Sequence, residues 1–280
     1  MPELPEVETL RRMLDSRVRS RTIVAARRSR SRLHVSSRGG ALSALVGRRV
    51  ERVERRGKYL IFRLDAEHAL LSHLGMSGRW LFFDRVPESP MLHVHARLEF
   101  SDGTRLWFQD PRRFGQLRVL VGGALARDAS LTRLGRDPLD PPLTGSELAA
   151  LARGVRTSVK VLLLDQRRIA GIGNIYASEI LHRARVDPRR RSLLVTRAQW
   201  SAVAAEIPAV LNEAIDSLGT TFSMYRTLSG EPGGFGDRLR VYDRAGERCL
   251  TCGSVIRRIV QGQRATYYCP HCQSRGGSGS

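Results

Sequence analysis

The chain opens with Met1-Pro2-Glu3-Leu4-Pro5-Glu6, and the rest of the sequence is best interpreted outward from these six residues. If Met1 is removed, Pro2 becomes a free secondary amine with two carboxylates, those of Glu3 and Glu6, within about one helical turn. The same residues also suit an ordinary helix start, because proline fits the first helical positions and acidic side chains complement the helix dipole. The stretch alone favours the ordinary helix start, so the rest of the chain must decide.

Charge gives the first indication of a partner. The 280 residues are enough for two domains, and they carry 47 Lys and Arg against 27 Asp and Glu, a net charge of +20. A polyanion is the default partner of so basic a chain, and a solvated arginine-rich surface is the alternative. Only Lys58 and Lys160 are lysines. They mark places where a compact, deprotonatable ammonium is needed, unless their positions are due to chance.

The sequence contains no sign of a membrane or secretory segment. No run of about 18 apolar residues occurs, and the N-terminus is acidic where a signal peptide would be basic and then apolar. We therefore expect a cytoplasmic protein that has no membrane contact.

Apolar spacing divides the chain into a β-rich and a helical part. Val7, Leu10 and Leu14 recur with helical spacing, which predicts a first helix up to about Arg19. Short β-branched and aromatic runs between turn signals then predict a β-sandwich or flattened barrel. Its strands are expected at 49–53, 59–64, 69–73, 79–83, 96–100, 105–108 and 117–120.

The pattern becomes helical after the linker that Pro138, Pro141 and Pro142 indicate. We expect Asn174 to cap one of the helices and Pro208 to kink the last one. Residues 219–236 form a Ser/Thr/Gly-rich stretch without periodicity, and a loop of that length is usually functional or mobile. The helices are predicted at 144–153 (or from 146), 158–167, 174–183 and 197–218.

Four cysteines near the end of the chain predict a metal site. Cys249-x2-Cys252 and Cys269-x2-Cys272 are separated by 16 residues, and the chain has no other cysteine. This spacing is typical of a tetrahedral site for one structural Zn²⁺, whereas a pair of disulfides is disfavoured in a reducing compartment. Between the pairs, residues 255–260 and 265–268 predict a hairpin with Arg264 near its tip, suited to a phosphate contact.

Six motifs in a fixed order identify the family that the chain resembles. They are residues 2–9, 56–60, 73–78, 110–115, 171–177 and the four-cysteine hairpin. With them the chain resembles the formamidopyrimidine-DNA glycosylase family of base-excision repair enzymes, which also includes endonuclease VIII. The resemblance implies an α+β fold: an N-terminal helix plus β-sandwich, a C-terminal helical domain with a helix-two-turn-helix motif, and a C-terminal four-cysteine zinc-finger β-hairpin.

The domain boundaries follow from these patterns and from the resemblance. We expect a catalytic helix and β-sandwich at 2–125, a linker at 126–143, and a helical domain at 144–236 that includes a lesion loop at 219–236. A zinc finger at 237–275 and a flexible tail at 276–280 complete the chain.

The resemblance implies a bifunctional glycosylase and abasic-site lyase that removes 8-oxoguanine and formamidopyrimidines. The reaction needs an amine that attacks C1′ of the sugar and forms a Schiff base, followed by β- and δ-elimination. Arginine stays protonated, so Pro2, Lys58 and Lys160 are the candidates, and an N-terminal amine has the lowest pKa class of the three. The resemblance assigns the nucleophile to Pro2. Glu3 is then the general acid/base, and Glu6 a positioning or electrostatic partner.

The resemblance also implies contacts to double-stranded DNA that contains an oxidised base. The DNA would lie between the two domains with the damaged nucleotide flipped out. Three side chains would fill the hole in the duplex, Arg112 facing the orphaned base. Of these DNA contacts, those of His73 and Met76 have an alternative interpretation, because each residue also suits a core position. The phosphate contacts would be Lys58, His73, Asn174 and Arg264, the hole-filling residues Met76, Arg112 and Phe114, and Lys160 would lie near the damaged strand.

Other functions remain open at this point. Gly234 stands where the family often has an aromatic residue, and Phe222-Ser223-Met224-Tyr225 does not match the usual loop, so the lesion range is in question. An endonuclease VIII-like enzyme for oxidised pyrimidines is one alternative, although Leu4 and residues 109–114 favour the purine enzyme. A catalytically silent zinc-finger protein that binds damaged DNA is another. The resemblance also leads us to expect a monomer.

Overall fold

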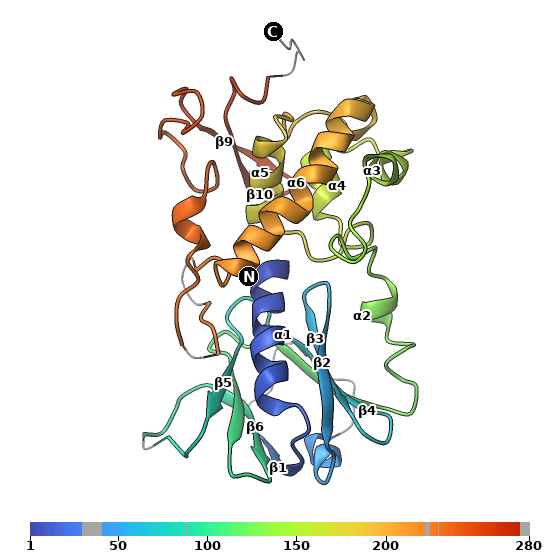
Figure 1. Ribbon diagram of the computed structural model, residues 1–280, viewed down its shortest axis with the longest axis vertical. Helices are drawn as coiled ribbons and strands as arrows, with labels where there is room; N and C mark the ends of the chain where they lie inside the picture. The colour runs from blue at the N-terminus through green and yellow to red at the C-terminus, as the bar shows by residue number, and fades with distance from the viewer. Residues whose placement is uncertain (30–40, 88, 222–224, 229, 275–280) are drawn as a thin grey trace. The chain divides into compact units, whose positions relative to one another are not determined.

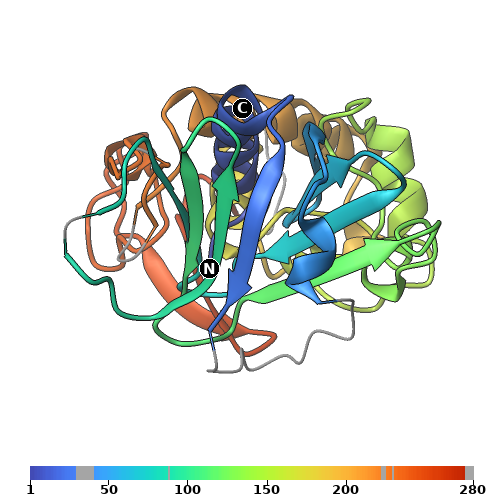
Figure 2. The same ribbon diagram turned by 90° about the horizontal axis from the view of Figure 1, so that it is seen from below.

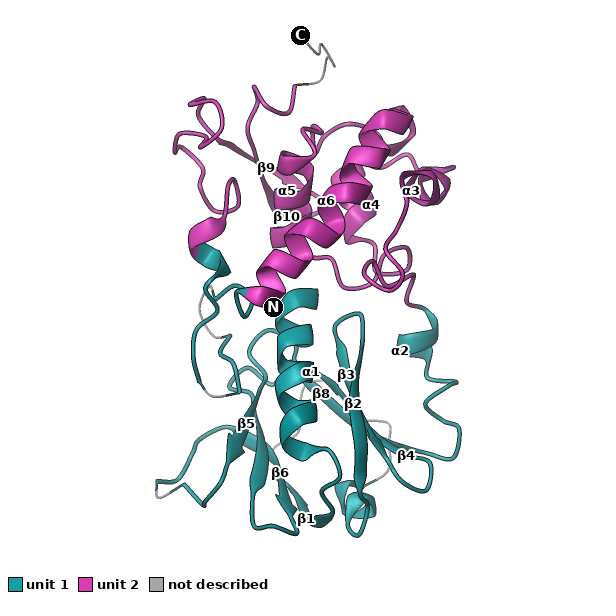
Figure 3. Cartoon of the chain, viewed as in Figure 1, with its two compact units in different colours: residues 1–133, 217–236 teal, residues 134–216, 237–280 magenta. Residues whose placement is uncertain are grey.

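The computed structural model describes residues 1–29, 41–87, 89–221, 225–228 and 230–274, and the chain forms two compact units (Figure 1, Figure 3). Unit 1 consists of residues 1–133 and 217–236, and unit 2 of residues 134–216 and 237–280. The sequence-based division placed residues 219–236 with the helices. In the structure these residues cluster with the N-terminal part, because they bond to the first helix.

The part of unit 1 that the structure describes contains one long helix and two antiparallel four-stranded sheets (Figure 1, Figure 2). The first sheet has the order β1-β6-β7-β5 and the second β2-β3-β4-β8. The elements are α1 (Leu4–Val18), β1 (Ile23–Arg28), η1 (Leu42–Leu45), β2 (Val50–Arg56), β3 (Tyr59–Leu64), β4 (His68–His73), β5 (Arg79–Phe83), β6 (Val94–Phe100), β7 (Arg105–Gln109), β8 (Gln116–Val121) and α2 (Ala129–Thr132).

One apolar cluster joins α1 to both sheets. The helix contributes Val7, Leu10, Leu14 and Val18, and both sheets add their inward-facing side chains. At its centre Trp80 meets the rings of Phe62 and Phe108 edge-on, at centroid distances of 5.4 and 5.1 Å. Alternation of inward apolar and outward polar residues thus produces the predicted sandwich. The seven predicted strands are confirmed to within about three residues, and β1 is an additional strand.

In its described residues, unit 2 has four helices longer than one turn and the short η2 (Ser192–Leu194). The four are α3 (Gly145–Ala152), α4 (Val159–Leu164), α5 (Asn174–Arg183) and α6 (Arg197–Asp216). Thr144 and Glu147 form a capping box that starts α3, as expected for a Thr-x-x-Glu sequence. Helix α6 continues through Pro208. None of the helices in the described residues is long and apolar enough to span a bilayer.

Two helix ends differ from the prediction. Helix α4 stops at Leu164 because Asp165 has an extended backbone. Gly173, and not Asn174, occupies the N-cap position of α5, which leaves the Asn174 side chain available for a tertiary contact.

The last part of unit 2 is the predicted hairpin. Strands β9 (Arg257–Gln261) and β10 (Arg264–Tyr268) pair in an antiparallel register that closes at Arg264 opposite Gln261. The short helix η3 (Phe235–Arg238) precedes it in the chain. A small apolar cluster of Val241, Ile256 and Tyr267 supports the hairpin. The predicted α+β architecture is therefore confirmed.

Candidate active site and metal centre

The first turn of α1 holds two buried carboxylates beside Pro2. Glu3 is the N-cap residue, and its backbone N–H donates to Oε2 of Glu6 at 2.7 Å in a capping box. Glu3 is 5% and Glu6 1% exposed, and Pro2 is also buried. A buried carboxylate is tolerated when it is hydrogen-bonded, and the bond from Glu3 to Glu6 meets this need within the capping box. It fixes the backbone that carries the Pro2 nitrogen.

The Glu6 carboxylate also holds the 217–236 segment. Its Oε1 accepts from the backbone N–H of Thr220 at 2.8 Å, while the Tyr225 hydroxyl donates to the Glu6 carbonyl at 3.5 Å. Burial and then the charge of Glu6 raise the pKa of Tyr225, so its hydroxyl stays protonated. Gly219 has φ of +85°, and an added Cβ would lie 3.0 Å from Glu6 Cγ. This part of the loop is therefore built around Glu6.

Only part of the unusual loop motif can be placed. Of Phe222-Ser223-Met224-Tyr225, the first three residues lie outside the described residues. Gly234 donates its N–H to the Ser217 carbonyl at 2.8 Å. Among the described residues, apart from its chain neighbours, the nearest atom to the place of a Cβ is the Ser217 oxygen at 3.6 Å, which is an ordinary contact distance.

Lys58 and His73 lie close together near one end of the second sheet. Lys58 is buried in the turn between β2 and β3, and the neighbouring Tyr59 pairs with His73, ring to ring at 4.7 Å. Burial and then the positive charge of Lys58 lower the pKa of His73 to about 4. Because the Gly75 N–H donates to His73 Nδ1 at 3.1 Å, the single proton is on Nε2. That nitrogen can donate to a phosphate.

Two loops present the three predicted hole-filling side chains. Met76 is 46% and Phe114 39% exposed, and the Arg112 guanidinium lies 5.0 Å from the centroid of the Phe114 ring. An added Cβ on Gly75 would lie 2.5 Å from the backbone of Phe114, so the loops touch directly. Exposed apolar side chains on well-anchored loops are suited to insertion between bases.

Asp110, fully buried, anchors the second of these loops. Its carboxylate accepts from the backbone N–H groups of Arg112 at 3.2 Å and Gly115 at 2.7 Å, and from the Ser77 hydroxyl. Ser77 belongs to the loop that carries Met76, so one carboxylate holds both loops. The sequence motif included Asp110, but its spacing alone did not indicate this role.

In unit 2, Asn174 and Lys160 converge on one carbonyl of the hairpin. Asn174 Nδ2 and Lys160 Nζ each donate to the Ala265 oxygen at 2.9 Å, and Lys160 also donates to Thr266 Oγ1 at 2.8 Å. Lys160 is fully buried, so its ammonium lies inside unit 2. Arg264, the neighbour of Ala265, is exposed. Lys160 and Asn174 therefore position the strand that carries Arg264.

A buried glutamate that the sequence did not reveal extends this arrangement. Glu179 is fully buried on α5, and its carboxylate accepts from the backbone N–H groups of Arg240, Val241 and Tyr242 at 2.8 to 3.0 Å. Burial raises the pKa of Glu179, and these three bonds oppose the rise. In the sequence, Glu179 is only a single acidic residue in a predicted helix. Such residues are too common to indicate a buried contact.

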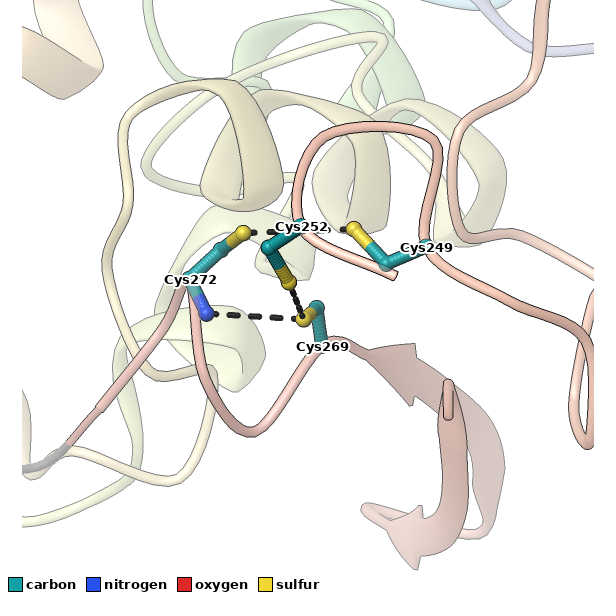
Figure 4. A group of neighbouring side chains, drawn as sticks. All are labelled: Cys249, Cys252, Cys269 and Cys272. Carbon is teal, nitrogen blue, oxygen red and sulfur yellow. Dashed lines mark hydrogen bonds between the residues drawn. The ribbon is translucent and has the colours of Figure 1, made fainter. Parts of the chain in front are cut away.

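The four cysteines gather into one cluster, as the spacing predicted (Figure 4). All four thiols are free, and their Sγ atoms lie within 4.8 Å of one another, with separations of 3.4 Å for Cys252–Cys269 and 3.9 Å for Cys249–Cys272. Four thiolates at 2.3 Å from a tetrahedral zinc ion are about 3.8 Å apart. The cluster thus fits one structural Zn²⁺ and excludes the two disulfides.

Three family models match the chain in sequence order. They are described as the formamidopyrimidine-DNA glycosylase N-terminal domain (residues 1–117), the formamidopyrimidine-DNA glycosylase H2TH domain (residues 134–226), and the zinc finger found in FPG and IleRS (residues 246–275). A formamidopyrimidine-DNA glycosylase from Bordetella pertussis is 45% identical over 283 residues, which cover 98% of this chain and all of the relative.

Solved structures agree with the sequence matches. The MutM (FPG) protein from Thermus thermophilus has 38% sequence identity and a TM-score of 0.86. Lactococcus lactis FPG in complex with abasic-site DNA has 28% identity and a TM-score of 0.87, and a mutant of it with DNA containing Fapy-dG has 29% and 0.89. Each match covers 98% of this chain and all of the other.

Replacing Asp110 with Asn tests its role as the anchor of both loops. The amide would place an N–H group against the N–H donors that now meet a carboxylate, so we expect a loss of about 3 kcal/mol in the free energy of unfolding. Urea unfolding measures this loss. The exposed Asp84→Asn is the control and should change stability by less than about 0.5 kcal/mol. Equal effects of the two substitutions would contradict the anchor.

The lowered pKa of His73 predicts how stability depends on pH. Between about pH 6.5 and pH 4 the unfolded chain protonates this histidine and the folded chain does not, so stability falls as the pH falls through this range. The His73→Gln variant should lose stability less steeply than the parent over that interval. Urea unfolding at pH 7, 5.5 and 4.5 measures the slopes, with the exposed His93→Gln as control. Parallel curves for parent and His73→Gln would refute the assignment.

Proposed function

The chain belongs to the formamidopyrimidine-DNA glycosylase family, and we propose that it uses Pro2 as the nucleophile to remove oxidised purines from DNA. It is a DNA glycosylase with lyase activity at abasic sites, and its partner is DNA that carries lesions or abasic sites. We further propose that it acts as a monomer in the cytoplasm.

The three candidates for the attacking amine differ in burial and in basicity. Lys160 Nζ is buried in unit 2 and bonded to the hairpin, so it is in no position to attack a sugar. Lys58 has the higher intrinsic pKa class, which leaves less free base at neutral pH than an N-terminal amine has. Pro2, once Met1 is removed, is a secondary amine next to two carboxylates. Its reaction with C1′ forms an iminium ion as the base departs.

The two carboxylates would divide the proton transfers and the positioning. Glu3 is adjacent to Pro2, so it would protonate the sugar ring oxygen and then shuttle protons as the 3′ and 5′ phosphates leave by β- and δ-elimination. Glu6 accepts from the Glu3 backbone and from Thr220. We therefore assign Glu6 a positioning role, in which it holds the nucleophile and the 217–236 segment in place.

The remaining site residues would bind the DNA around the lesion. In unit 1, Lys58 and the neutral imidazole of His73 would donate to DNA phosphates. In unit 2, Asn174 and Arg264 would do the same. Met76 and Phe114 would fill the space of the extruded nucleotide, and Arg112 would meet the orphaned base through hydrogen bonds.

The capping box beside Pro2 is the observation that carries this proposal. A silent DNA-binding protein accounts for the charge and the zinc cluster. It gives no reason for a proline, whose nitrogen becomes a free amine when Met1 is removed, to stand beside two buried carboxylates. A nucleophilic amine at Pro2 gives that reason, because its reaction needs a proton donor next to it.

Borohydride trapping on DNA with an abasic site tests the nucleophile. Reduction of the Schiff base links enzyme and DNA covalently, and we expect Pro2→Gly to lower the yield by at least about tenfold because a secondary amine is replaced. A variant extended by two residues before Met1, in which the Pro2 nitrogen is an amide, should form no adduct and still bind the DNA. Adduct formation by the extended variant at the parent's level would exclude Pro2.

A comparison of lesions tests the substrate range. We expect single-turnover excision of 8-oxoguanine opposite cytosine to be at least about tenfold faster than that of thymine glycol, since the pocket must favour one transition state over the other. Both rates are measured on duplexes of the same flanking sequence, and cleavage of an abasic site serves as a control for intact lyase chemistry. Faster removal of thymine glycol would overturn the purine assignment.

A further inference from the structure

A histidine outside the four-cysteine motif contacts the metal cluster. His182 lies in the last turn of α5, is only 3% exposed, and has its Nε2 3.7 Å from Sγ of Cys249. That separation is within hydrogen-bonding range for sulfur. The four ligands were identified from cysteine spacing, which does not connect residue 182 with them.

The surroundings of the ring decide which nitrogen carries the proton. Among the described residues, Nδ1 of His182 is buried and has no hydrogen-bond partner. With the proton on Nε2, the N–H points at sulfur and only an acceptor lone pair is unused. The other tautomer would bury an unpaired N–H and direct a lone pair at the sulfur, which is much less favourable. Nε2–H is therefore the donor.

The charge of a zinc-loaded cluster makes such a donor useful. Four thiolates and one Zn²⁺ carry a net charge of −2, and Cys249 and Cys269 are both buried. Sulfur atoms in such a site need N–H donors, and the Cys272 backbone already supplies one to Cys269 at 3.4 Å. Such outer-sphere donors orient the ligand and strengthen metal binding.

We propose that His182 is an outer-sphere residue of the zinc centre, whose Nε2–H donates to the Cys249 thiolate and ties the metal site to α5. The same helix is joined to the C-terminal part of unit 2 at two further points, through Asn174 to Ala265 and through Glu179 to residues 240–242. His182 completes this series at the end of the helix. It is a positioning residue, because it acts on the metal through Cys249.

Two substitutions separate the hydrogen bond from the packing of the ring. His182→Phe keeps a planar ring and removes the N–H, whereas His182→Gln retains an N–H donor at about the same distance from the backbone. Ile180→Val, fully buried on the same helix, is the matched control for a small loss of packing. Circular dichroism identifies the variants that fold, and all measurements use the full-length zinc-loaded chain.

Zinc release to a chromophoric chelator is the first measurement. Loss of an outer-sphere donor weakens metal binding about 10- to 100-fold, so we expect His182→Phe to release zinc correspondingly faster and His182→Gln to recover part of the parent's behaviour. In the Co²⁺-substituted protein, the sulfur-to-cobalt charge-transfer band should shift in His182→Phe and not in Ile180→Val.

Two results would overturn the proposal. One is a His182→Phe variant that releases zinc at the parent's rate with an unchanged cobalt spectrum. The other is an Ile180→Val variant that accelerates release as much as His182→Phe does, because the effect would then be general loosening of the helix. Neither readout depends on the glycosylase reaction, so the outcome is independent of whether Pro2 is the nucleophile.

Discussion

The carboxylate of Glu6 is the interaction on which the arrangement of unit 1 depends. One oxygen accepts from the Glu3 backbone and so begins α1, while the other accepts from Thr220, 214 residues further along the chain. The same group thus determines where the Pro2 nitrogen lies and where the loop returns. Since a buried carboxylate is stable only when its hydrogen bonds are made, α1 and this loop have to fold together.

Buried carboxylates also position backbone segments elsewhere in the chain, whereas the apolar cores mainly stabilise the units. Asp110 joins the two loops that carry Met76 and Phe114, and Glu179 holds backbone N–H groups of the segment that leads to the zinc cluster. Apolar packing tolerates repacking within its volume, whereas a hydrogen bond to a carboxylate fixes a position and a direction. The positions of the loops that carry Met76 and Phe114 are therefore determined by hydrogen bonds, the less tolerant of the two interactions.

Periodicity explains what the sequence could predict. The seven strands follow from alternation, the helix at 144–153 from its capping residue Thr144, and the four-cysteine cluster from spacing, because these signals are local. The family motifs pointed to Pro2 and Glu3. The partners of Glu6 and His182 could not be predicted, because Thr220 and Cys249 are distant in sequence and no short pattern links them. Asn174 was misjudged as a cap for the same reason, since its true partner is Ala265.

The positions of the two lysines explain why lysine is used there in place of arginine. In a chain whose other basic side chains are all arginines, both Lys58 and Lys160 are buried. Lys160 directs one compact ammonium at the Ala265 carbonyl and the Thr266 hydroxyl with no exposed surface. A planar guanidinium with five N–H groups would need more space, whereas a compact ammonium rotates to suit its acceptors. Lysine therefore suits position 160, where a cation has to fit inside the fold.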